Sequence, residues 1–208
     1  MIQPKIFWLV LLGLWLGFFT WYTSFGGPMT ATEITTILEA SERRGRNPEQ
    51  LARLRNFLES DTGDDFVMVN VIEFNDPVPD LPGMPADASA DDLLNEYMAY
   101  MFPALLSRAS HPIMMGEAAA PALDIWGLEG DDNWTRAALM RYRSRRDMIE
   151  IAGNPEFLGP HEYKVGAMQK TLAFPVDPWT NAGDPRFILA LILIIIGQAN
   201  SLRWTKRS

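Results

Sequence analysis

Cysteine is absent from the 208-residue chain, and histidine occurs only twice. The first absence excludes a disulfide-stapled fold, a thiolate metal site and a cysteine nucleophile. Two histidines are too few for a multi-histidine metal centre within one chain. Basic residues are also scarce, with 18 Lys and Arg against 26 Asp and Glu and a net charge of −8, which disfavours nucleic acid as a partner. Phosphate-binding, dinucleotide-binding and hydrolase motifs are missing too, so we expect no cofactor and no metal.

Charge is missing altogether from Ile6–Gly26. About 20 apolar residues cross a hydrocarbon core of roughly 30 Å, and Trp21 and Tyr22 lie where an aromatic belt would meet the interface. A cleaved signal peptide is the alternative, because Lys5 gives a basic start and two small residues have cleavage-site spacing. The run is longer than a signal core of about 7–15 residues. The favoured interpretation is an uncleaved transmembrane anchor over residues 1–27.

A second uncharged run, FILALILIIIG, covers Phe187–Gly197. A buried helix of a soluble core is the alternative, but no polar face interrupts the run. Arg203, Lys206 and Arg207 cluster just beyond it, as basic residues do at the cytoplasmic end of a span. The sequence therefore predicts a C-terminal transmembrane helix over residues 185–204.

The basic flanks of both spans predict that the two ends of the chain are cytoplasmic. Residues 28–186 would then lie on the non-cytoplasmic side of a bacterial inner membrane or its equivalent. This region holds 14 of the 18 basic residues and all 26 acidic ones, a net charge of −12. Gly13 and Gly17 form a G-x-x-x-G pattern inside the first span, which lets two helices approach closely.

Between the spans, the pattern predicts a helical extension over residues 28–62 and a second domain over residues 63–178. Periodicity and turn residues predict these elements: two helices within 30–60, strand Phe66–Phe74, loop 75–90, helix Asp91–Ala109, strand Ile113–Ala120, loop 121–133, strand Thr135–Tyr142, a helix capped by Ser144, a helix from Asn154-Pro155-Glu156 to about Gln169, and strand Thr171–Val176. The order β-α-β-β-α-β is that of the ferredoxin-like unit, an α+β fold. The sheet face opposite the helices is also apolar, which predicts a homodimer.

Four segments are distinctive: FVMVNVIEF, NEYMAYMFPALL, NWTRAALMRYRSRRDMIEIAGNPEF and VGAMQKTLAFP. Over roughly residues 48–176 the chain resembles a domain-of-unknown-function family of the dimeric α/β-barrel superfamily. The shared positions are Asn70, Tyr97, Tyr100, Pro103, Gly116, Trp134, Arg141-Tyr142-Arg143-Ser144 and Asn154-Pro155-Glu156. The resemblance implies a dimeric α/β barrel but no particular reaction. The chain differs from the family in its membrane helices, its long proline-rich loop, and Tyr163-Lys164 in place of a His-Arg pair.

Two polar residues are candidates for chemistry in this fold. Asn70 is the one uncharged polar side chain in an apolar strand, so it either binds a ligand in the cleft or ties down a neighbouring loop. His161 has carboxylates nearby in sequence, among them Glu156. It is the candidate catalytic residue, as a general base, with a solvated helix position as the alternative.

The end of the third strand adds further candidates. Four arginines lie between Arg141 and Arg146, where they would form either an anion site near a helix N-terminus or ion pairs with the abundant acids. Strand alternation sends Arg141 and Tyr142 to opposite faces. The candidate ligand-binding residues are Asn70, Tyr97, Arg141 and Tyr142.

Two functions agree with these features. The first is a membrane-anchored α/β-barrel homodimer that binds a small molecule or serves as an accessory module of a membrane assembly, with a membrane-protein partner. The second is a cofactor-free enzyme that acts on a lipophilic small molecule. The first needs no catalytic residue, whereas the second needs a titratable group in the cleft, with His161 the candidate.

Overall fold

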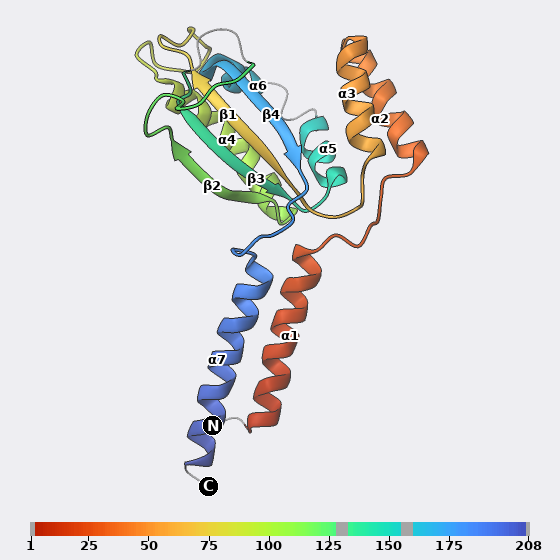
Figure 1. The fold of residues 1–208 in the computed structure, drawn as a ribbon, viewed down its shortest axis with the longest axis vertical. Helices are drawn as coiled ribbons and strands as arrows, with labels where there is room; N and C mark the ends of the chain where they lie inside the picture. The colour runs from red at the N-terminus through yellow and green to blue at the C-terminus, as the bar shows by residue number, and fades with distance from the viewer. Residues whose placement is uncertain (1–2, 128–132, 155–159, 207–208) are drawn as a thin grey trace. The chain divides into compact units, whose positions relative to one another are not determined.

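The computed structural model describes residues 3–127, 133–154 and 160–206. The chain divides into two compact units (Figure 1). One unit is formed by residues 25–177, and the other by the two chain ends, residues 1–24 and 178–208. The candidate functional residues all belong to the first unit.

A four-stranded sheet organises residues 25–177. Its strands are β1 (Phe66–Phe74), β2 (His111–Glu117), β3 (Arg136–Tyr142) and β4 (Met168–Val176), in the spatial order β2-β3-β1-β4 with every pairing antiparallel. The most continuous apolar run, β1, lies in the interior of the sheet, where both of its edges pair with neighbouring strands, β3 and β4. The predicted α+β class is thereby confirmed.

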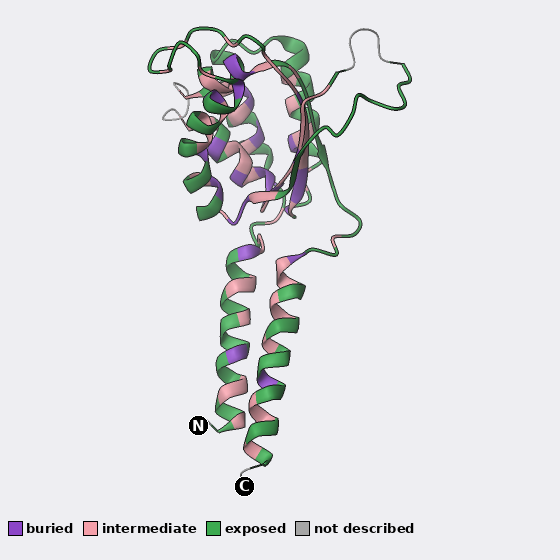
Figure 2. Ribbon diagram, turned by 90° about the vertical axis from the view of Figure 1, so that its left-hand side faces the viewer, coloured by how far each residue is buried: buried purple, intermediate pink, exposed green. Residues whose placement is uncertain are grey.

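Three helices accompany the sheet: α4 (Ala90–Ser107), α5 (Arg145–Gly153) and α6 (His161–Ala167). A core of Met101, Leu105 and Ile151 packs with side chains of β3, and a second core joins Leu93 to Ala167. Buried residues gather where helices and sheet face each other (Figure 2). Along the chain the order is β1-α4-β2-β3-α5-α6-β4, so two helices lie between β3 and β4 where the β-α-β-β-α-β unit has one.

The opposite face of the sheet carries an apolar surface. Strand pairing places Val69 beside Leu139 on one side and Phe174 on the other, and Val71 beside Leu172. Leu172 and Phe174 are exposed. These side chains belong to none of the three hydrophobic cores that the described helices of this unit form, and they define what we call the open sheet face.

Residues before the sheet form the helices α2 (Ala31–Arg43) and α3 (Pro48–Glu59). Each begins with a capping box, Thr30 with Glu33 and Asn47 with Gln50. The two helices share a core that also contacts Ile149 of α5.

The N-terminus of α5 ties this extension to the domain. The Arg146 guanidinium donates to both oxygens of Glu33, at 2.8 and 3.2 Å. Arg145 is almost fully buried, donates to the Phe57 carbonyl and to Ser60 Oγ, and lies over the Phe57 ring. These contacts connect α5 to both ends of the extension.

The chain ends form α1 (Pro4–Tyr22) and α7 (Pro185–Thr205), which pack against each other. Both are long and apolar enough to cross a membrane by length and composition. That finding agrees with the two predicted spans, although a signal sequence or a core helix would pass the same test.

Some predicted boundaries differ from the structure. The last strand begins at Met168 rather than Thr171, and the helix before it ends at Ala167 rather than near Gln169, because the ladder with β1 reaches Phe74. The second strand begins at His111, two residues earlier than expected, and ends at Glu117, three residues earlier than expected. Its Pro112 is accommodated because β2 is an edge strand. Residues 128–132 of the expected loop, Pro155 and Glu156 of the expected helix start, and Arg207 lie outside the described residues.

Candidate functional site

Tyr97 of α4 lies at the centre of a group of titratable side chains. The rings of Tyr97 and His161 meet edge to face with centroids 6.2 Å apart. The ammonium of Lys164 lies 5.8 Å from the centroid of the Tyr97 ring. His161 and Lys164 are three residues apart on α6 and therefore share a helix face. We call Tyr97, Tyr142, His161 and Lys164 the Tyr97 cluster.

Tyr142 joins the cluster from β3. It packs, like Tyr97, against the buried core of Met101, Leu105 and Ile151. Met98 of α4 and Met140 of β3 line the same core. Methionine side chains adapt to apolar shapes, so the surroundings of the two phenols are apolar and deformable.

Each pKa shift in this cluster favours the uncharged form of its group. Burial raises the pKa of Tyr97, and burial together with the charge of Tyr97 raises the pKa of Tyr142 to about 12. Burial lowers the pKa of the Lys164 ammonium. Burial and, second, the charge of Lys164 lower the pKa of His161. The common cause is desolvation, which penalises every charged form in an apolar environment.

Asn70 lies on the helix-facing side of β1 and is partly buried. Its side-chain Nδ2 donates to the carbonyl oxygens of Met68 at 3.1 Å and Ala138 at 3.3 Å. The amide donor is thus engaged with the backbones of two adjacent strands. No contact between Asn70 and His161 is present among the hydrogen bonds of the described residues.

Arg141 lies apart from the Tyr97 cluster, on the other face of β3 from Tyr142. Its side chain is 1% exposed, pairs with Asp65 at 2.9 Å and donates to the Ala109 carbonyl at 2.7 Å. The neighbouring arginines are paired as well. Arg143 bonds both oxygens of Asp147, and Arg146 pairs with Glu33. The sequence left open an anion site or ion pairs with acidic residues for this run of arginines, and these contacts agree with ion pairs.

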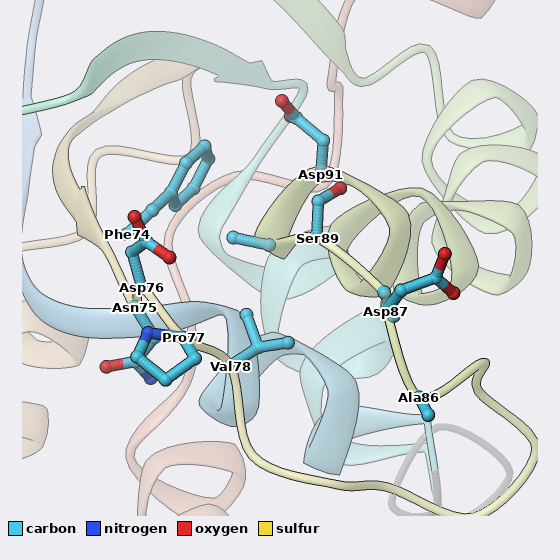
Figure 3. A pocket seen from close by; sticks show the side chains of 11 residues that line it. Phe74, Asn75, Asp76, Pro77, Val78, Ala86, Asp87, Ser89 and Asp91 are labelled. Carbon is cyan, nitrogen blue, oxygen red and sulfur yellow. The ribbon is translucent and has the colours of Figure 1, made fainter.

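A pocket of about 480 Å³ lies where β1 gives way to the proline-rich loop and where α4 begins (Figure 3). Phe74, Asn75, Asp76, Pro77 and Val78 line one side, and the segment Ala86–Asp91 lines the other. Asp91 also pairs with Arg136 at 2.7 Å. Among residues 3–127, 133–154 and 160–206, no three His, Asp or Glu side chains are arranged to hold a metal ion.

The structure therefore brings together some of the candidate residues and separates others. Tyr97 contacts His161 and shares a core with Tyr142, whereas Arg141 lies on the opposite sheet face and Asn70 bonds to backbone carbonyls. Sequence reasoning did not select Lys164 as a site residue. The available signal was its rarity, because Lys164 and Lys170 are the only lysines between the two spans.

Comparison with known proteins gives a fold but no family. No family model matches the chain, and no curated protein matches it. A crystal structure of a protein of unknown function from Rhodopseudomonas palustris is similar, with a TM-score of 0.52 and 15% identity over 65% of this chain and 96% of that one. The methylated form of that protein gives a TM-score of 0.52 and 16% identity over 67% and 96%. A cofactor-independent oxygenase from Streptomyces nogalater has a TM-score of 0.36 and 8% identity over 58% and 99%, too low to carry an argument.

Proposed function

We propose that this chain is a membrane-anchored α/β-barrel protein that binds a small, largely apolar molecule at the Tyr97 cluster. The observation that carries the proposal is the convergence of Tyr97, Tyr142, His161 and Lys164 from three elements in apolar surroundings. Largely apolar walls with a few convergent polar groups are typical of small-molecule sites. In this role the protein serves as a binding or accessory module of a membrane assembly.

The anchoring part of the proposal is supported by α1 and α7. Both are long and apolar, and basic residues lie at the far ends of the two runs, Lys5 in the first turn of α1 and Arg203 in the last turn of α7. By the positive-inside rule, both termini are cytoplasmic and the domain lies on the opposite side. A ligand that partitions into the bilayer would then be available to the domain.

The barrel part of the proposal requires a second copy of the chain. The open sheet face exposes Leu172 at 47% and Phe174 at 43%. Contiguous apolar surface of this kind is unfavourable in water and favours association. A two-fold pairing of open sheet faces would bury both surfaces in one step.

A cofactor-free enzyme is the second candidate, and His161 favours it. The lowered pKa keeps its imidazole neutral near pH 7 and able to accept a proton. The exposure of His161 and the engagement of the Asn70 amide with backbone favour binding over catalysis. In the enzyme, His161 would remove a proton from a ligand seated against Tyr97.

Mass spectrometry of an organic extract tests the binding function directly. The full chain is purified in a mild neutral detergent and compared with Tyr97→Ala and with the matched control Tyr100→Ala, which changes an exposed tyrosine of the same helix. We expect one compound to be enriched over a detergent blank in the unmodified protein and in Tyr100→Ala, and lost in Tyr97→Ala. An extract with no enriched compound, or equal retention in all three proteins, would refute the proposal.

A further inference from the structure

The ammonium of Lys164 stands out from the other cations of the domain. Most arginines of residues 25–177 pair with a carboxylate: Arg43, Arg53, Arg55, Arg108, Arg136, Arg141, Arg143, Arg145 and Arg146. Lys164 has no carboxylate partner within the part of the chain that the structure describes. Its contact there is the face of the Tyr97 ring. In a region of net charge −12, an ammonium without a carboxylate is unexpected.

The position of Lys164 makes the lack of a carboxylate partner energetically unfavourable. Its side chain is partly buried between α4 and α6, and burial lowers its pKa. A desolvated cation is stabilised when an anion enters beside it, because the attraction is strong where water is excluded. The ring of Tyr97 supplies only the weaker cation–π attraction. The site is thus short of one negative charge.

Two tyrosines belong to the same cluster as this cation, Tyr97 in contact with it and Tyr142 in the core that Tyr97 shares. The raised pKa values of Tyr97 and Tyr142 keep both phenols protonated at neutral pH, so each offers an O–H donor to a ligand. Hydrogen bonds to an ionised acceptor are about twice as strong as those between neutral groups. A negatively charged group at Lys164 would therefore find donors on α4 and β3 as well.

The surroundings of the charged group are apolar. Met98, Met140 and Ile151 belong to the same core as the two tyrosines. A ligand that satisfied only Lys164, such as a small inorganic anion, would leave this surface unused. A ligand with an apolar body would contact the methionines while its charged end faced the ammonium.

We propose that the Tyr97 cluster binds an amphipathic anion, with a single negatively charged head on Lys164 and the tyrosine hydroxyls and an apolar body among the methionines. This inference rests on the proposed binding function and specifies the class of its ligand. Because the ammonium of Lys164 attracts a negative charge, it would make the site bind an acid more tightly than the corresponding alcohol. The acidic surface does not prevent this, since its field is screened within about 8 Å at physiological ionic strength.

Paired titrations with 4-phenylbutyrate and 4-phenylbutan-1-ol test the inference. The two probes share an apolar body and differ in the charge of the head. The full chain is placed in phosphatidylcholine nanodiscs, and binding is measured by calorimetry for the unmodified protein, Lys164→Met, Lys164→Arg and Lys170→Met. The last variant is the matched control, because Lys170 also lies over an aromatic ring, that of Trp134, but outside the cluster.

We expect Lys164→Met to weaken phenylbutyrate binding roughly tenfold or more, as loss of a charged hydrogen bond does. Binding of the alcohol should change little, which would also show that the variant remains folded. Lys164→Arg should retain part of the preference for the acid, and Lys170→Met all of it. Equal binding of acid and alcohol by the unmodified protein, or an unchanged preference in Lys164→Met, would overturn the inference. Either result would leave the proposed binding function standing if the organic extract contains an uncharged compound.

A second set of nanodiscs, containing phosphatidylglycerol, identifies the source of the anion. Weaker apparent binding of phenylbutyrate in these discs would assign the site to an anionic lipid of the bilayer. Unchanged binding would assign it to a soluble organic acid. Both outcomes support a site for an amphipathic anion, because each requires the probe to bind through its charge.

Discussion

The indole Nε1 of Trp8 donates a hydrogen bond to the hydroxyl of Ser201, 3.2 Å away and 193 positions later in the chain. The same indole ring lies against Gly197, where an added Cβ would approach Trp8 to 2.4 Å. The small residue Gly197 on α7 thus leaves room for the aromatic ring of Trp8 on α1. The hydrogen bond between Trp8 and Ser201 fixes the register of the two helices. Small residues and interhelical hydrogen bonds are how helices associate in an apolar medium.

Gly197→Leu should separate the two helices. The new side chain cannot enter without displacing the Trp8 ring, and such overpacking costs about 1–3 kcal/mol. We expect a lower midpoint of thermal unfolding, followed by tryptophan fluorescence in neutral detergent. Gly13→Leu is the control, because nothing lies within 4 Å of a Cβ at Gly13. An equal effect at both glycines would contradict the assigned helix contact.

A membrane-impermeant maleimide can test the proposed orientation of the domain across the membrane, because the natural chain has no cysteine that would react with it. A single cysteine at Leu123 or Trp179, both almost fully exposed, should be labelled in intact spheroplasts. A cysteine at Lys206 should be labelled only after lysis, since the basic end is expected to be cytoplasmic. The reverse pattern would show that the domain is cytoplasmic.

Local patterns predicted the elements of the fold well where the signal is local. The strand Phe66–Phe74 has the bounds that its β-branched run indicates, and Ser144 caps a helix as the sequence predicts. The start of β4 could not be predicted from the local sequence. The segment before Thr171 contains no break, and it becomes extended because it pairs with the end of β1, which is a tertiary effect.

The site was less predictable than the fold. Tyr97 and His161 are 64 positions apart, and their ring contact depends on how α4 packs on α6. Alternation correctly separated Arg141 from Tyr142, but no pattern indicated that Asp65 would be the partner of Arg141. The rarity of Lys164 between the two spans did not single it out, because a lysine on a short helix is usually solvated. Its significance follows from burial and from the groups beside it.

The open sheet face should hold two copies of the domain together. Residues 25–177 form a compact unit with its own core, so we expect this fragment to be a dimer by light scattering. Replacing both Leu172 and Phe174 with lysine would place like charges at the interface and should give a folded monomer. Val165→Lys, at an exposed apolar position on α6, is the control and should remain dimeric. A monomeric parent fragment would remove the support for the barrel.

Glu33→Gln should loosen the helical extension. Glu33 completes the capping box of α2 and pairs with Arg146, and these hydrogen bonds lower its pKa from 4.5 to about 2. Because the folded-state pKa is depressed, the stabilisation is complete above about pH 4.5 and is lost as the pH falls towards 2. Loss of cap contacts typically costs about 1 kcal/mol. Hydrogen exchange of α2 should be faster in the variant at pH 7 and should converge with the unmodified protein near pH 2.

Two alanine substitutions separate the structural residues from the functional ones. Asn70→Ala removes a donor shared by two adjacent strands and should cost about 1 kcal/mol, a fall in melting temperature of roughly 2–4 °C in a chain of this size. His161→Ala changes an exposed side chain and should alter stability by less than about 0.5 kcal/mol.

The same pair decides between a binding protein and an enzyme. In a binding module, His161→Ala should leave ligand retention nearly unchanged, because Tyr97, Tyr142 and Lys164 remain. In an enzyme, loss of a general base should slow turnover of the extracted compound by about 10²–10⁴ while the melting temperature is kept. Mass spectrometry of the compound after incubation with each variant gives the measurement. An Asn70→Ala protein with an unchanged melting temperature would show that the two carbonyl contacts of Asn70 are dispensable for stability, and would contradict its structural role.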